Sequence, residues 1–222
     1  MMLGKYKDIL EKNKKRVLAL ANDVLKGFEL CIKANKEQDA TKASEAREML
    51  KDAHDRNNKI DNEIIKTLAL FSPEARDLRI VISYLKIASE LTRISDYVRS
   101  YAKGVKMQLS SDFDMSALQN DINSFLDSTY SSLKAAVESV ESDSEDKLEK
   151  LYQKVHVEES KCDDIVSILE KNIMQQICIR PEDASEFLTF IKNLRRLERL
   201  SDRSVNVVKL AYFAHKGGKL KL

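Results

Sequence analysis

The hexapeptide RISDYV at Arg93–Val98 is repeated as RLSDRS at Arg199–Ser204, about 106 residues further along the chain. The only two prolines, Pro73 and Pro181, are separated by a similar distance. A segment repeated at a fixed offset indicates an internal duplication. We therefore expect two halves of similar structure, each built around one copy of this motif.

The composition favours long helices. The 222 residues include only 5 Gly and 2 Pro, although 43% of the chain is hydrophobic and 33% is charged. So few breakers leave little room for the turns of a β-sandwich or a β-barrel. The chain is long enough to bury a core in one large or two small domains. We predict an all-α protein.

A long helix is predicted from Pro73 to about Met107. Ser72 is expected to be its N-cap, with Pro73 at the first helical position and Glu74 in the first turn. Apolar residues alternate in steps of four and three, the spacing of a helix packed on other helices. These residues are Ile80, Tyr84, Ile87, Leu91, Ile94, Val98, Tyr101 and Val105.

The second half is expected to repeat this plan. Pro181 would begin the last helix, which would end near Gly217 and Gly218. A break is expected at Gln108–Ser116, and another turn at Glu141–Asp146. We predict a tandem repeat of two antiparallel three-helix bundles, the first at 1–109 and the second at 110–222. The remaining helices are expected at roughly 5–35, 38–71, 115–141 and 144–178.

Charge and cysteine content bear on location and partners. Residues 1–36 carry a net charge of +5, residues 111–170 of −10 and residues 180–222 of +5. This uneven charge could form patches for docking partners or for homodimerisation, or it could belong to ordinary solvated helix faces. Nucleic-acid binding has little support, because no row of basic residues interleaved with aromatic residues occurs. Three cysteines without CxxC spacing, and no apolar leader or span, predict a cytoplasmic protein.

Two helices of the second half place acids within apolar stripes. Glu159 and Asp163 lie one turn apart, as do Glu198 and Asp202. Both pairs share a face with residues that should be buried, where an unpaired carboxylate is costly. Four hard oxygen donors brought together suit a divalent or trivalent cation. We therefore expect these acids to point inwards and to bind metal between the two helices.

Charge pairing is the alternative explanation for these acids. Four arginines are near enough to pair with Glu198 and Asp202 on a solvated face, namely Arg195, Arg196, Arg199 and Arg203. Catalysis has little support in the sequence. None of the three histidines has the Glu-x-x-His spacing of a di-iron bundle, and no phosphate loop, nucleophile elbow or HExxH occurs. We predict that the protein is not an enzyme.

The sequence resembles a known family. The opening SPEARDLR at Ser72–Arg79, together with LERLSD at Leu197–Asp202, is similar to the signature helices of the PhoU family. The resemblance covers nearly the whole chain, including the duplication. It implies that the [DE]-x-x-x-D motifs bind metal ions or multinuclear clusters, and thus supports Glu159, Asp163, Glu198 and Asp202 as ligands. Fe, Zn, Mn and Mg are all compatible with carboxylate ligands.

The first half departs from the family pattern. It reads LTRISD, so that Thr92 replaces the glutamate while Asp96 is kept. In the preceding helix Asn57 and Asp61 stand where two acids are expected. His54 lies on the same face, either as a compensating ligand or as a hydrogen-bonded core histidine. We expect a weaker metal site here, because fewer carboxylates offset the charge of the cation.

The resemblance implies a regulator of phosphate uptake and of phosphate-starvation signalling. PhoU-like proteins help repress the starvation response by linking the phosphate ABC transporter, through its ATPase, to a sensor histidine kinase. The protein would then reach the membrane only through these partners. Two alternatives are also compatible with the sequence: a bundle that stores or handles metal, and a metal-free structural bundle.

Overall fold

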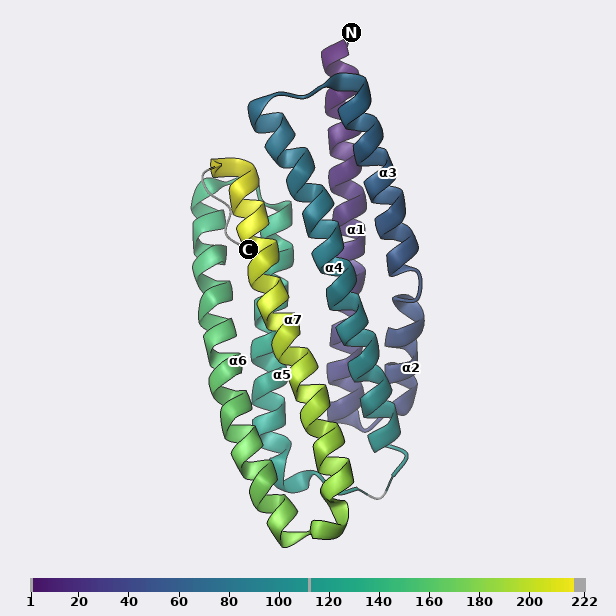
Figure 1. Ribbon diagram of the computed structural model, residues 1–222, viewed down its shortest axis with the longest axis vertical. Helices are drawn as coiled ribbons and strands as arrows, with labels where there is room; N and C mark the ends of the chain where they lie inside the picture. The colour runs from purple at the N-terminus through teal and green to yellow at the C-terminus, as the bar shows by residue number, and fades with distance from the viewer. Residues whose placement is uncertain (1, 112, 218–222) are drawn as a thin grey trace.

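The computed structural model describes residues 2–111 and 113–217 and confirms an all-α protein made of two bundles. The two bundles lie side by side with their helices nearly parallel to the long axis (Figure 1). The helices of the first bundle are α1 (Met2–Glu37), α2 (Ala40–Met49), α3 (Ala53–Phe71) and α4 (Ala75–Gln108). The second bundle consists of α5 (Gln119–Glu141), α6 (Glu145–Ile179) and α7 (Ala184–Lys216), with short 3₁₀ turns at Ser116–Leu118 and Pro181–Asp183.

The helix predicted at 38–71 is broken in two, which corrects the sequence-based expectation. The break falls at Leu50, the C-cap of α2, and α3 begins three residues later at Ala53. No glycine or proline marks this position. Leu50 is 1% exposed, and a Cβ placed on Gly27 of α1 would lie 2.8 Å from its Cδ1. At the break, this leucine packs into the space above Gly27.

The prediction for Pro73 is also corrected. Ser72 is not an N-cap but the left-handed C-cap of α3, with φ of 43°, and α4 begins at Ala75. A proline disfavours helical geometry in the residue before it, so α3 ends there. Pro181 begins the 3₁₀ turn that leads directly into α7. Neither proline interrupts a helix. The last helix ends at Lys216 with Gly217 as its C-cap, and Gly218 and Asp112 lie outside the described residues.

The last helices of the two bundles, α4 and α7, pack side by side at the interface between the bundles (Figure 1). Gly104 of α4 lets the helices approach closely, because an added Cβ would overlap the amide of Asn193. Ion pairs cross the same interface, including Lys14–Asp143 at 2.8 Å and Lys36–Asp127 at 3.0 Å. Arg203, which lies in the second copy of the repeated motif, pairs with Glu90 of α4 at 3.2 Å across this interface.

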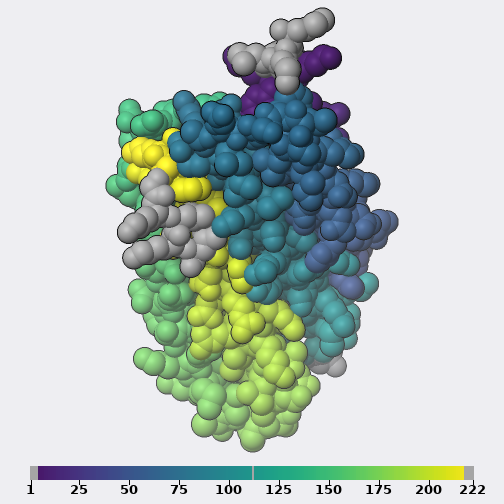
Figure 2. Space-filling model, turned by 45° about the horizontal axis from the view of Figure 1, so that its top comes forward, coloured from purple at the N-terminus to yellow at the C-terminus, as the bar shows by residue number. Residues whose placement is uncertain are grey.

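The space-filling view shows helices of both bundles merging into one continuous surface (Figure 2). Each bundle has a core of side chains that are almost fully buried, such as Phe28 and Leu91 in the first and Phe125 and Phe187 in the second. Within the described residues, no helix has a stretch long and apolar enough to cross a membrane.

Candidate metal centre

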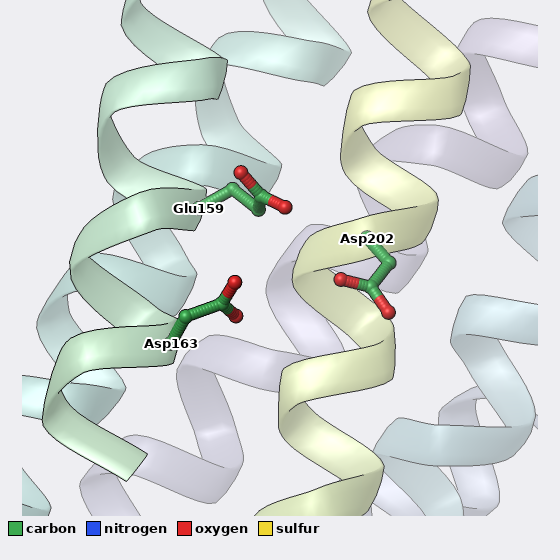
Figure 3. Close-up of side chains that lie close together, drawn as sticks. All are labelled: Glu159, Asp163 and Asp202. Carbon is green, nitrogen blue, oxygen red and sulfur yellow. The ribbon is translucent and has the colours of Figure 1, made fainter. Parts of the chain in front are cut away.

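Three of the four predicted second-half acids come together between α6 and α7. Carboxylate oxygens of Glu159, Asp163 and Asp202 all lie within 4.8 Å of one another. Figure 3 shows Glu159 and Asp163 extending from α6 towards α7, where Asp202 lies on the facing side. We call these three residues the acidic trio. Among the described residues, it is the one group of three or more acidic, histidine or cysteine side chains this close together.

The acidic trio lies at the edge of the helix contact and not in the core, which corrects the inward-facing prediction. Asp163 and Asp202 are exposed and Glu159 is half-buried. Neighbouring positions fill the core instead, such as Val155 and Cys162 of α6. A step of four residues turns a helix by about 400°, so each such step moves a side chain about 40° around the axis. The acids of the trio therefore lie at the edge of the apolar stripe, on its solvent side.

The electrostatics of the acidic trio disfavour three full negative charges. Burial raises the pKa of Glu159, and the nearby charges of Asp163 and Asp202 raise it further. The pKa values of Asp163 and Asp202 are raised for the same two reasons, with Glu198 among the repelling charges. Within the described chain, no hydrogen bond or ion pair neutralises any member of the trio. Three oxygen acceptors without a donor favour a cation.

The geometry of the acidic trio fits a metal ion. Metal–oxygen bonds to Mg²⁺ or Ca²⁺ are about 2.0–2.6 Å long, so two ligand oxygens on opposite sides of an ion are about 4–5 Å apart. Oxygens separated by 4.8 Å or less can therefore share one ion without a change in the helices. Only small rotations of the carboxylates would be required.

The fourth predicted ligand, Glu198, is held by an arginine. Both of its carboxylate oxygens accept hydrogen bonds of 2.9 Å from Nη1 of Arg195. Arg195 also pairs with Glu170 of α6 at 2.7 Å and so joins the two helices beside the acidic trio. Charge pairing thus applies to Glu198, whereas Asp202 has no such partner. Glu170 was missed in the sequence, although it lies eleven residues after Glu159 and thus on the same side of α6.

The first half does not gather its predicted ligands in the same way. His54 is exposed and not a core residue, and its Nε2 lies 3.0 Å from a carboxylate oxygen of Asp96. Asn57 donates to Asp61 at 3.1 Å, while one side-chain oxygen of each is buried without a hydrogen-bond partner. Thr92 is buried and donates to the Ala88 carbonyl at 2.8 Å. The donor set therefore fits a metal less well here than in the acidic trio.

The fold and the acidic trio define a class of protein: a duplicated helical bundle with acids between the last two helices of the second copy. The PhoU domain model matches residues 17–105 and again residues 122–211. The chain belongs to the PhoU family. The two matched segments begin 105 residues apart, close to the offset between the repeated motifs.

Curated relatives and solved structures agree with this assignment. A phosphate-specific transport system accessory protein PhoU homolog from Clostridium acetobutylicum is 26% identical over 98% of this chain and 97% of its own length. A homolog of the same description from Pseudomonas putida is 24% identical over 94% of this chain and 79% of its own. The fold is similar to PhoU from Pseudomonas aeruginosa, with a TM-score of 0.88 at 22% identity over 96% of this chain and 100% of the other.

Proposed function

We propose that the protein is an accessory and regulatory protein of phosphate uptake, which acts by docking to other proteins and not by catalysis. The match of both halves to the PhoU domain is the observation that carries this proposal. The curated relatives in Clostridium acetobutylicum and Pseudomonas putida are named as accessory proteins of phosphate-specific transport. The proposed partners are the ATPase of a phosphate ABC transporter and a sensor histidine kinase, and the link between them would repress the starvation response.

We also propose that the acidic trio holds one or more metal ions. Glu159 and Asp163 would supply carboxylate oxygens from α6, and Asp202 would supply them from α7. A bound cation would neutralise the three charges and tie the two helices together. The ion pair between Arg195 and Glu170 already joins the two helices across the same gap. The role of the site would then be to stiffen the second bundle for docking.

Deletion of the gene tests the regulatory proposal. In the source organism, a phosphate-starvation reporter should become active in phosphate-rich medium when the gene is deleted, and the wild-type gene should restore repression. Purified protein should also capture the transporter ATPase and the cytoplasmic part of the sensor kinase from defined mixtures. A reporter that responds to phosphate normally in the deletion strain would contradict the proposal.

Metal analysis tests the site independently of regulation. Freshly purified protein should contain metal by plasma emission, and the Asp163→Asn/Asp202→Asn variant should contain little. If the wild type remains free of metal after incubation with Fe, Zn, Mn or Mg followed by desalting, the metal proposal fails while the regulatory proposal stands.

A further inference from the structure

A cavity of about 350 Å³ lies between the two bundles. Its lining comes from α1 and α4 of the first bundle, from α7, and from the end of α5 with the residues that follow it. Figure 1 shows these segments in the upper part of the molecule. The volume lies within the range of pockets that hold small molecules. We call this cavity the inter-bundle pocket.

Apolar side chains of both bundles form much of the wall of the inter-bundle pocket. The first bundle contributes Leu10, Ile80 and Ile87, and the second contributes Val140, Ala211 and Ala214. Water gains little from contact with such a wall, whereas the hydrocarbon part of a ligand is stabilised by it.

Two polar side chains on the wall, Tyr84 and His215, have no hydrogen-bond partner among the described residues. Tyr84 is 8% exposed, and burial together with the charges of Asp143 and Glu11 raises the pKa of its hydroxyl, which therefore remains protonated and can donate. Burial lowers the pKa of His215, so its ring is neutral near pH 7 and carries one N–H donor. A buried hydroxyl without a partner is unfavourable, so both groups are available to a ligand.

The charged side chains around the inter-bundle pocket leave a surplus of positive charge. Each of its two carboxylates has a lysine within 4 Å, in the pairs Lys14–Asp143 at 2.8 Å and Lys15–Glu11 at 3.7 Å. Lys7 and Arg76 also line the pocket, and within the described chain neither belongs to an ion pair. The planar guanidinium of an arginine matches the oxygens of a carboxylate or a phosphate. The two cations without partners therefore favour an anion.

A ligand that satisfies the whole inter-bundle pocket must combine an oxyanion with an apolar group. A phosphate monoester carries about two negative charges and three free oxygens, so it can accept from more of these donors than a carboxylate can. We propose that the inter-bundle pocket binds a small organic phosphate. Its oxygens would accept hydrogen bonds from Arg76, from the hydroxyl of Tyr84 and from Lys7, while its apolar group would contact the wall.

The inter-bundle pocket is separate from the acidic trio. Asp202 precedes His215 by 13 residues, or about 20 Å along α7. The inference therefore depends neither on bound metal nor on the regulatory role. Because the pocket is lined by both bundles, a ligand would bind the folded protein alone and raise its melting temperature.

Calorimetric titration of the full chain with phenyl phosphate, in the presence of chelator, tests the proposal. We expect one ligand per chain with a Kd of about 1 mM or tighter. Inorganic phosphate, which lacks the ring, and benzyl alcohol, which lacks the charge, should each bind at least about tenfold more weakly. Inorganic phosphate that binds as tightly as phenyl phosphate would refute the role of the apolar wall. Benzoate that binds as tightly would refute the choice of a phosphate.

Substitutions in the inter-bundle pocket test the assigned donors. Arg76→Gln should weaken the binding of phenyl phosphate by about tenfold, whereas Arg47→Gln is the matched control, since Arg47 is also exposed but lies on α2. Tyr84→Phe should weaken binding by about fivefold without lowering the melting temperature of the free protein, because no hydrogen bond within the described chain is lost. Circular dichroism would verify that each variant folds.

The ring signals of the three histidines locate the ligand by NMR. Phenyl phosphate should shift the signal of His215 in proportion to binding, whereas His54 on α3 and His156 on α6 should not respond. Neither heat nor a shift of the His215 signal at about 10 mM phenyl phosphate would overturn the proposal. Binding that Arg76→Gln weakens no more than Arg47→Gln does would overturn it as well.

Discussion

Replacing one member of the acidic trio should make the metal-free protein more stable. Asp202→Asn removes a charge whose carboxylate oxygen lies within 4.8 Å of those of both other members. Two unit charges at about 4 Å repel each other by about 1 kcal/mol in a water-like surrounding. Asp202 is exposed, so the water-like value applies. The two lost repulsions are together worth about 1–2 kcal/mol after screening by salt, and the lost attraction of Arg203 and Arg199 reduces the net gain to about 1 kcal/mol.

This change should be visible in a melting curve recorded with chelator. For a chain of this size, 1 kcal/mol shifts the melting temperature by about 2–4 °C, so Asp202→Asn should melt about 2–4 °C above the wild type. Glu45→Gln is a suitable control, because Glu45 is exposed on α2 and has no ion-pair partner among the described residues. The gain should shrink in 1 M salt, where charges are screened beyond about 3 Å. A variant no more stable than the control would refute the repulsion argument.

The same argument fixes a pH dependence. The folded pKa values of Glu159, Asp163 and Asp202 are raised above their ordinary values, so the folded state binds protons more tightly than the unfolded chain. The destabilisation by the acidic trio is therefore present at neutral pH and is lost as the pH falls through these raised values. The stability advantage of Asp202→Asn over the wild type should accordingly decrease between pH 7 and pH values near 4.

Three further predictions concern the acidic trio, its neighbour Arg195 and the interface between the bundles. By plasma emission, Asp202→Asn should lose most of the bound metal and Asp96→Asn little; equal losses would contradict the asymmetry between the halves. Arg195→Gln should bind metal more tightly, by about fivefold in a competition titration, because it removes a nearby positive charge and releases a carboxylate; unchanged affinity would argue against this. Glu90→Gln should lower the free energy of unfolding by about 1–3 kcal/mol in urea, because Glu90 is 12% exposed and accepts two 3.2 Å bonds from Arg203 across the bundle interface.

The duplication and the helices could be read from the sequence because they rest on periodic features. The match between Arg93–Val98 and Arg199–Ser204 predicted the repeat, and apolar spacing placed most helix boundaries within a few residues. The break at Leu50 could not be predicted, because the residues around it form helices readily. Leu50 contacts Gly27 of a different helix at the break, and such contacts do not appear in local spacing.

The position of the acidic residues was predicted only in part. Spacing on a helix showed correctly that Glu159 and Asp163 share a side with buried residues, but it does not distinguish the centre of a stripe from its edge. Glu198 pairs with Arg195 and does not join the other three acids, and this choice depends on side-chain rotamers. It also depends on Glu170 of the neighbouring helix, which takes the other end of the same guanidinium. The structure therefore brings together three of the four acids that were predicted to form one site.

The two halves place an aspartate at the same point of the repeat but give it different surroundings. Asp96 of α4 has an imidazole nitrogen 3.0 Å away, so its carboxylate already has a neighbour that can donate a hydrogen bond. Asp202 of α7 instead faces two further carboxylates and no donor among the described residues. Nearby basic residues offset only part of this repulsion, because the pKa values of the three acids remain raised, so the second half has the stronger electrostatic reason to take up a cation. The substitution of Thr92 for an acid strengthens this difference, because a buried hydroxyl that donates to the Ala88 carbonyl adds no charge to the first half. The duplicated scaffold thus places an aspartate on the last helix of both bundles, while the proposed metal-binding chemistry would be concentrated in the second.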